Sequence, residues 1–326
     1  MSIFKQLMAT NIQFMTTKQA LPYLFIIPYL LLTGCEADNK KHALPDDSAH
    51  LASSTEMSAT SPATITNIEA LQNYYATLNY TWPITSKQQI PESLLTELPR
   101  DIKLASPVGL KKALFIQALL PVVLAEQKNL LKKRDRVLQL LAQSNDSATI
   151  TRNPWFVNLL KEYRINARLS LEKQKEELYK RVDTLPVELI IAQAAIESGW
   201  GTSRFAQEGN SLFGEWTFSK QGGLVPNDRH ADKNHSVKQF DSIQLSVRSY
   251  LRNINRNNAY KELRSARANM RKNKQILNAD ELAVFLHRYS QKGYDYVDSV
   301  LSLLRSKDFA VISHLKLNDY FESPSS

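Results

Sequence analysis

The chain has 326 residues, more than one hydrophobic core usually holds, so at least two folded units and some non-globular sequence are expected. Charged residues make up 22% and hydrophobic residues 43%, which excludes a wholly disordered chain, and a mean hydropathy of -0.34 excludes a polytopic membrane protein. The single cysteine, Cys35, excludes an intramolecular disulfide framework and a cysteine-cluster zinc site. The formal net charge of +9 is compatible with an anionic partner, although so modest a charge more often serves only solubility.

Residues 1–34 are predicted to be a signal peptide. Lys5 and Lys18 are the only charged side chains before Cys35, and residues 21–32 form an apolar stretch too short and too rich in proline for a stable membrane-spanning helix. Leu32-Thr33-Gly34-Cys35 resembles the lipobox of bacterial lipoproteins, in which the cysteine is lipidated and the chain is cut before it. The resemblance implies a lipid anchor at Cys35 in the bacterial cell envelope, facing the periplasm, with the outer membrane preferred. The alternative is an ordinary signal peptide with an incidental cysteine.

Residues 35–67 are predicted to form a disordered tether, because they are rich in Ser, Thr, Ala, Asp and Pro and show little apolar periodicity. An all-helical region is expected over residues 68–184. It should begin with two short helical pieces, Ile68 to Tyr80 and Gln88 to Leu98, and continue with a longer helix that opens at Ser106-Pro107.

Pro121 is expected to kink or divide that longer helix. Asn153-Pro154 should open one further amphipathic helix that continues to Leu178. The alternating charges of residues 172–181 indicate a solvated helix face rather than a binding patch.

Glycine usage changes at the start of a second predicted domain, residues 185–320. Six of the nine glycines lie between Ser198 and Leu224, together with Trp200 and Trp216. Irregular backbone with large flat side chains suits a sugar-binding cleft, because aromatic faces cover the apolar faces of pyranose rings. Composition alone equally allows two tryptophans packed into a core.

A helix is predicted over residues 186–198, ending at Gly199. Gln193 and Glu197 are four residues apart and therefore share a face, with Glu197 in the last turn beside Trp200. The negative end of the helix dipole and the apolar neighbours both raise the pKa of a carboxyl group in that place. Such a group keeps a proton at neutral pH, as the general acid of glycoside hydrolysis must, although a glutamate that merely caps or salt-bridges the helix end fits the pattern too.

Two segments resemble the signature of glycoside hydrolase family 73. They are Ile191-Ala192-Gln193-Ala194-Ala195-Ile196-Glu197-Ser198-Gly199-Trp200-Gly201-Thr202-Ser203 and Asn210-Ser211-Leu212-Phe213-Gly214. Members of this family are peptidoglycan N-acetylglucosaminidases, and the chain is most similar to its Bax-type bacterial members. The resemblance covers roughly residues 185–304 and implies that Glu197 is the catalytic acid. It also implies a mainly α (α+β) fold, namely a lysozyme-like glucosaminidase domain with a small β-hairpin lobe behind the all-helical N-terminal region.

The same resemblance implies further site residues. Tyr296 best matches the tyrosine at the catalytic centre, but the loop before it is one residue longer than in the family, so Tyr289 and Tyr294 remain competitors. A half-buried core tyrosine is the alternative for any one of them. The substrate-binding residues expected are Gln193, Ser198, Trp200, Asn210, Phe213, Trp216, Tyr289 and Tyr294.

A second catalytic carboxylate is harder to assign. Several family members carry a second glutamate in the hairpin lobe, but no glutamate lies between Trp216 and Ser242. A retaining enzyme needs a nucleophile close to Glu197, and an inverting enzyme needs a base farther away. Asp228 is the candidate base, and the preferred alternative is attack by the acetamido group of the substrate itself, oriented by Tyr296.

No cofactor or metal site is predicted. Asp228, His230, Asp232 and His235 match no zinc signature, and the chain has no phosphate loop or Rossmann glycine pattern. The basic segments lack interleaved aromatic residues, so nucleic acid is not an expected partner. The expected partners are peptidoglycan glycan strands and, through lipidated Cys35, a membrane.

The sequence therefore predicts a peptidoglycan hydrolase, an endo-β-N-acetylglucosaminidase that cleaves the β-1,4 bond between N-acetylglucosamine and N-acetylmuramic acid, with Glu197 as general acid. Two alternatives stay open. One is a lytic transglycosylase or muramidase, although residues 210–214 stand where a transglycosylase would carry Gly-Leu-Met-Gln. The other is a non-catalytic murein-binding scaffold that lacks a second carboxylate.

Overall fold

The computed structural model describes residues 65–85, 88–92, 95–143, 147–217, 223–225, 236–310 and 312. All of them belong to one compact unit. The predicted signal peptide, Cys35 and nearly all of the predicted tether lie outside the described residues, as does Asp228.

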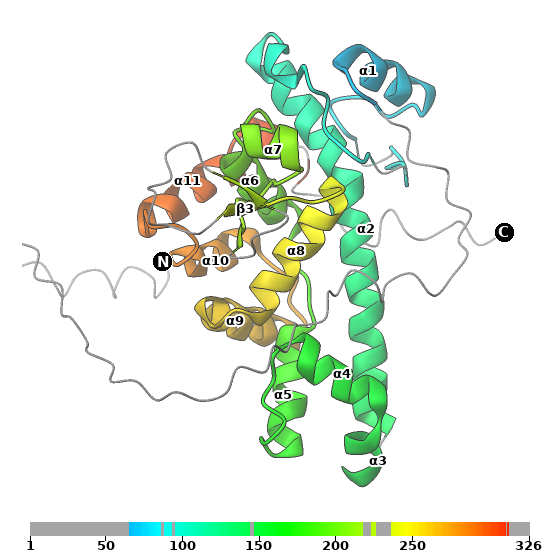
Figure 1. Ribbon diagram of the computed structural model, residues 1–326, viewed down its shortest axis with the longest axis vertical. Coiled ribbons are helices and arrows are strands. Elements are labelled where there is room, and N and C mark those ends of the chain that lie inside the picture. The colour runs from blue at the N-terminus through cyan, green and yellow to red at the C-terminus, as the bar shows by residue number, and fades with distance from the viewer. Residues whose placement is uncertain are drawn as a thin grey trace, which may run out of the picture. The chain divides into compact units, whose positions relative to one another are not determined.

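The described chain is mainly helical and carries one small antiparallel sheet (Figure 1). Its α-helices are α1 (Ile68–Thr77), α2 (Val108–Gln143), α3 (Ser147–Arg152), α4 (Pro154–Glu162), α5 (Leu171–Arg181), α6 (Val187–Ser198), α7 (Arg204–Gly209), α8 (Ile243–Arg256), α9 (Lys261–Lys272), α10 (Ala279–Ala283), α11 (Tyr294–Leu304) and α12 (Lys307–Ala310). Short 3-10 turns lie at η2 (Ile102–Leu104), η3 (Asn258–Tyr260) and η4 (Val284–Leu286). The strands β1 (Trp216–Thr217), β2 (Gly223–Leu224) and β3 (Ser236–Lys238) pair in the order β1-β3-β2, with Trp216 opposite Val237. The predicted fold class, mainly α with a small β lobe, is confirmed.

The longest helix, α2, runs through Pro121 without being divided by it. A proline inside a helix removes one backbone hydrogen bond and crowds the preceding turn, so packing must offset that cost. The helix supplies such packing, because Leu119, Leu120, Val122 and Val123 are all fully buried. By length and composition α2 could cross a membrane, but 67% of its apolar window is buried inside the fold, as in a core helix.

Residues 88–98 are not helical where the structure describes them, so that predicted helix is wrong. Pro91 removes one backbone donor from the segment, and Pro99 disfavours helical backbone at Leu98 before it. Leu95 and Leu98 are nevertheless buried, and they anchor an irregular connection to the core.

The single helix predicted from Asn153 to Leu178 is in fact two, α4 and α5. The chain leaves α4 through Arg164, whose φ of 53° is left-handed. The Ile165 amide donates to the Leu160 carbonyl at 2.8 Å, and the Arg164 amide donates to the Lys161 carbonyl at 3.1 Å. This is the Schellman arrangement that ends helices, and the apolar periodicity that continues beyond it does not show the break.

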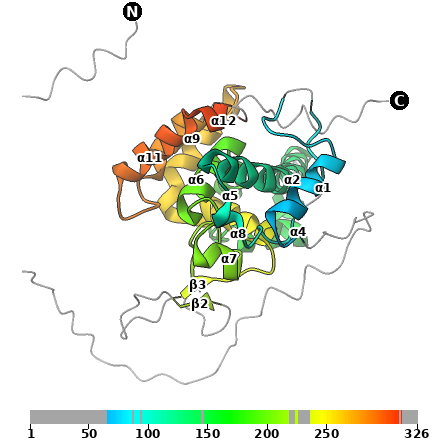
Figure 2. The same cartoon turned by 90° about the horizontal axis from the view of Figure 1, so that it is seen from above.

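Two hydrophobic clusters make up the core. The larger one joins α1 and the first half of α2 to α6, α8 and α11, so it draws residues from both sides of the boundary predicted near residue 184. The smaller one joins the second half of α2 to α3, α4 and α5, which gather at that end of the helix in Figure 1. Helix α6 packs against both α2 and α11 and lies between them in both views (Figure 1, Figure 2). The C-terminal end of α6 is therefore held by its neighbours.

Candidate active site

The end of α6 is a tight turn that fixes the position of Glu197. Gly199, Trp200 and Gly201 have consecutive left-handed φ values of 59°, 61° and 78°. The Ser198 hydroxyl donates to the Ala194 carbonyl at 2.6 Å and accepts from the Gly201 amide at 2.8 Å. The Glu-Ser-Gly-Trp-Gly sequence thus builds this turn, and the Ser198 hydroxyl is occupied by it.

Glu197 lies in the last turn of α6 and is half-buried. Burial raises the pKa of its carboxyl group, and the hydrogen bond from Tyr296 and the charge of Lys292 oppose the rise without cancelling it. A Cβ atom placed on Gly214 would lie 3.7 Å from Glu197 Oε2, so the second motif packs directly against the acid. The two motifs, which stand apart in the sequence, therefore form one site.

A chain of hydrogen bonds orients the carboxyl group of Glu197. The Tyr250 hydroxyl donates to Gln193 Oε1, and Gln193 Nε2 donates to the Tyr296 hydroxyl at 3.0 Å. Because the Tyr296 hydroxyl accepts from Gln193, its own proton is available to the carboxyl group of Glu197, and Tyr296 is hydrogen-bonded to that group. Because Gln193 is fully buried, it positions Tyr296 rather than contacting a substrate. No sequence pattern singled out Tyr250, which lies on the buried face of α8.

Stacked aromatic rings support this hydrogen-bonded chain. Phe213 stacks on Tyr250 at 4.1 Å between ring centroids, and Tyr289 stacks on Tyr296 at 5.4 Å. The Tyr289 hydroxyl donates to the Phe213 carbonyl at 3.0 Å and so ties the second motif to the tyrosine segment. Phe213 and Tyr296 are each 3% exposed, so these rings form the rear wall of the site.

The other predicted binding residues lie in different surroundings. The Trp200 ring packs against Phe115 of α2 and Phe309 of α12. The Asn210 side chain donates to the Phe240 carbonyl at 3.1 Å and secures the loop after α7.

Two of the predicted sugar-binding aromatic rings are exposed. Trp216 on β1 is 57% exposed. Tyr294 is 68% exposed and stacks on His287 with 5.2 Å between centroids. Among the described aromatic residues of the prediction, these two present the most surface to a glycan.

Glu215 is a second carboxylate, which stands directly before Trp216 and therefore just outside the stretch from Trp216 to Ser242 that has no glutamate. Its Oε2 accepts from Ser249 Oγ at 3.0 Å and from Lys238 Nζ at 3.4 Å, while its Oε1 is buried and has no hydrogen-bond partner among the described residues. Burial raises the pKa of Glu215, and Lys238 and Ser249 oppose the rise. Its partners come from β3 and α8, so only the folded chain reveals the environment of this carboxyl group.

A raised pKa alone does not identify an acid catalyst. Glu188, at the other end of α6, has its pKa raised to about 7 by burial and by the charge of Asp280. Among the described contacts, no stacked tyrosine accompanies Glu188. Glu197 is distinguished by its partners, Tyr296 and Gly214.

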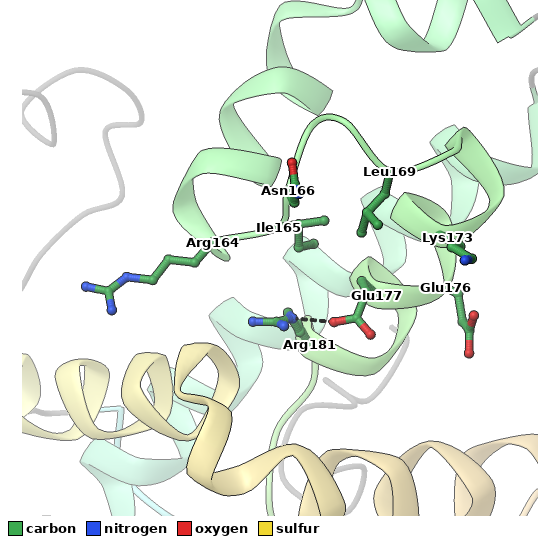
Figure 3. Close-up of a pocket in the computed structure, with 8 residues that line it drawn as sticks. All are labelled: Arg164, Ile165, Asn166, Leu169, Lys173, Glu176, Glu177 and Arg181. Atoms are coloured by element: carbon green, nitrogen blue, oxygen red, sulfur yellow. Dashed lines mark hydrogen bonds and ion pairs between the residues drawn. The ribbon is translucent and has the colours of Figure 1, made fainter.

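A pocket of about 350 Å³ lies away from these residues, beside the connection from α4 to α5 (Figure 3). Its lining contains both cations and anions, and Arg181 pairs with Glu177 at 2.8 Å. The lining residues are Arg164, Ile165, Asn166, Leu169, Lys173, Glu176, Glu177 and Arg181. None of the predicted catalytic or sugar-binding residues is among them.

Comparison with known proteins agrees with the geometry. The glucosaminidase family, described as mannosyl-glycoprotein endo-beta-N-acetylglucosaminidase, matches residues 172–308, which include Glu197, Gly214 and Tyr296. The chain is also similar to Protein bax of Escherichia coli (strain K12), with 28% identity over 235 residues that cover 71% of this chain and 83% of the relative. No solved structure matches the chain.

Proposed function

Because the chain is a Bax-type member of the glucosaminidase family, we propose that it is a peptidoglycan hydrolase with Glu197 as its general acid. The bond cleaved is the β-1,4 linkage between N-acetylglucosamine and N-acetylmuramic acid, on the reducing side of the former. One observation carries this proposal. Glu197 is half-buried with a raised pKa, lies close to Gly214 and is oriented by the Tyr296 hydroxyl.

The first chemical step uses the proton held on Glu197. The carboxyl group donates this proton to the glycosidic oxygen as the bond from the anomeric carbon to that oxygen breaks. The resulting carboxylate is stabilised by the hydrogen bond from Tyr296, which is already in place. Tyr296 thus acts through Glu197, and its single proton is not the one that orients the acetamido group, contrary to the expectation from the sequence.

The group that attacks the anomeric carbon is, in our proposal, the acetamido carbonyl of the substrate. We prefer this choice because Glu215 Oε2 is engaged by Lys238 and Ser249, and its Oε1, which has no partner among the described residues, is shielded from solvent. The attack forms a cyclic oxazolinium ion, which water then opens while Glu197 takes back a proton. This mechanism requires no carboxylate nucleophile.

The location of the enzyme is also proposed from the sequence. Lipidation of Cys35 would anchor the chain in the bacterial envelope on the periplasmic side, with the outer membrane preferred. An anchored hydrolase of this kind would reach the murein through its N-terminal segment.

Digestion of purified murein, followed by mass spectrometry of the fragments, tests the activity. We expect fragments with N-acetylglucosamine at their reducing ends, and a loss of roughly 100-fold to 10,000-fold in their rate of release for Glu197→Gln. The matched control is Glu262→Gln, since Glu262 is an exposed glutamate in the first turn of α9 and should not matter.

Other products would contradict the proposal. Anhydromuramic ends would identify a lytic transglycosylase. Binding to sacculi with no fragments released, and no difference between Glu197→Gln and the unaltered chain, would identify a scaffold.

A further inference from the structure

The segment that leads into α2 forms an exposed tip with two large apolar side chains. Leu104 is 71% exposed and Val108 is 61% exposed, and every residue between them is at least partly exposed. We call residues 103–111 the α2 tip. Isolated exposed apolar side chains are common, but Leu104 and Val108 stand only four residues apart on one exposed segment.

The charges of the α2 tip are all positive. Lys103 is exposed and Lys111 follows Val108 by three residues on α2, and neither has an ion pair within the part of the chain that the structure describes. Between residues 98 and 125 the one acidic residue is Asp101, whose carboxylate accepts from the Ile68 amide at 2.9 Å. The α2 tip itself therefore carries two cations and no anion, and the next residue, Lys112, pairs with Asp308 at 2.7 Å.

The N-terminal segment joins the described fold beside the α2 tip. The Arg100 amide donates to the Thr66 carbonyl at 3.0 Å, and Asp101 caps the first turn of α1 through Ile68. Figure 1 and Figure 2 show α1 next to the N-terminal part of α2. The first described residues thus lie within a few residues of Lys103, and Cys35 precedes them by 30 positions in the sequence.

We propose that the α2 tip is a membrane-docking surface whose partner is an anionic phospholipid bilayer. Leu104 and Val108 enter the interfacial region, while Lys103 and Lys111 contact the phosphate groups of the lipid heads. The apolar side chains suit the interfacial region of a bilayer, and the unpaired lysines suit its anionic head groups. Docking of this kind holds the folded unit at the same membrane to which Cys35 would attach it, and it needs only weak affinity, because a tether raises the local concentration of the bilayer.

Co-sedimentation with lipid vesicles tests the docking surface without the lipid anchor. A chain that begins at Glu36 lacks the apolar stretch of the signal peptide but keeps every described helix and both hydrophobic clusters. Vesicles of phosphatidylethanolamine and phosphatidylglycerol in a ratio of about three to one should bind it, and vesicles of phosphatidylcholine should bind it several-fold more weakly.

Three variants assign the binding to the tip. Leu104→Ser with Val108→Ser should weaken binding to the anionic vesicles roughly tenfold, and Lys103→Glu with Lys111→Glu should weaken it at least roughly tenfold. The control is Ile276→Ser, because Ile276 is 75% exposed but lies between α9 and α10. It should bind as the unaltered chain does, and all variants should keep the same circular dichroism spectrum.

Three results would overturn this inference. The unaltered chain could fail to bind the anionic vesicles, Ile276→Ser could lose as much binding as the tip variants, or the two tip variants could lose no binding. Tip variants that break up a dimer without affecting vesicle binding would assign the surface to contacts between copies of the chain. Release of fragments from soluble murein oligomers should be unchanged in all three, so a failure here is distinguishable from a failure of the proposed function.

Discussion

Two opposing influences set the protonation of Glu197. Burial favours the neutral carboxyl group, while the Tyr296 hydroxyl and the Lys292 charge favour the carboxylate. The balance leaves the pKa above its usual value, so the group keeps its proton to a higher pH than an exposed glutamate does. Activity that needs this proton is lost as the pH rises through that raised pKa.

Tyr296→Phe removes one of the two groups that favour the carboxylate, leaves the other, Lys292, and keeps the stacked ring. The pKa of Glu197 should rise further, so the basic limb of the pH profile of kcat/KM should move to higher pH. The maximum of kcat/KM should fall roughly tenfold or more, because the developing carboxylate loses a hydrogen bond. A pH profile of murein fragment release measures both effects.

The comparison variant is Tyr294→Phe, which removes a hydroxyl from an exposed ring two residues away. It should leave the basic limb where it is. If the two variants shift the limb equally, Tyr296 does not act through Glu197.

The sequence predicts much of this site at the scale of single residues, but only where spacing carries the information. Gln193 and Glu197 share a helix face, and the structure places them in one hydrogen-bonded chain through Tyr296. Spacing cannot show burial by distant segments. The ring of Trp200 is packed by Phe115 and Phe309, and Glu215 is engaged by side chains from other elements.

The turn after α6 shows the same limit at the scale of elements. Glycines at its start and end are visible in the sequence, but the space around each of them is not. A Cβ atom on Gly201 would lie 2.5 Å from Leu98 Cδ1 and 3.1 Å from Phe115 Cδ2. The non-helical segment that carries Leu98 therefore supports the turn after α6, which explains why Leu98 is buried despite the absence of a helix there.

Gly201→Ala and Gly109→Ala should have opposite effects on stability. Alanine at Gly201 should lower the free energy of unfolding by about 2–4 kcal/mol, because it must adopt the left-handed φ of 78° and its Cβ would collide with Leu98. Gly109 lies in the first turn of α2 with nothing within 4 Å of an added Cβ atom, so alanine there should raise it by up to about 1 kcal/mol. Urea unfolding measures both changes, and equal effects of the two substitutions would contradict this account of the turn.

Helix α2 links the two hydrophobic clusters of the molecule, since Leu130 packs against both. A buried ionic centre joins the same two parts. Asp183, 1% exposed, lies within 3.4 Å of Arg134 on α2 and within 3.0 Å of Arg271 on α9. Arg267 of α9 completes it by donating to the carbonyls of residues 180, 183 and 184. The residues before α6 are thus fastened to α2 and α9 by charge as well as by apolar packing.

The charge of Asp183 should contribute to stability in a pH-dependent way. Burial by itself would raise its pKa, but Arg267, Arg271 and Arg134 outweigh burial and hold the pKa below its usual value. A carboxyl group with a lowered folded-state pKa stabilises the fold above its unfolded-state pKa, and this contribution is lost as the pH falls through the folded-state value. The described fold should therefore loosen in acid at this centre.

Asp183→Asn leaves three arginines around a neutral side chain, so it should lower the free energy of unfolding at neutral pH by about 3–5 kcal/mol. In this variant, part of the loss of stability in acid should also be absent.

Because α4 and α5 bury a smaller cluster than α6 does, hydrogen exchange should show their amides losing protection before those of α6. Asp298→Asn, on the exposed face of α11, should change neither property. If the two variants unfold alike, or if α6 loosens together with α5, then the ionic centre does not join the two clusters.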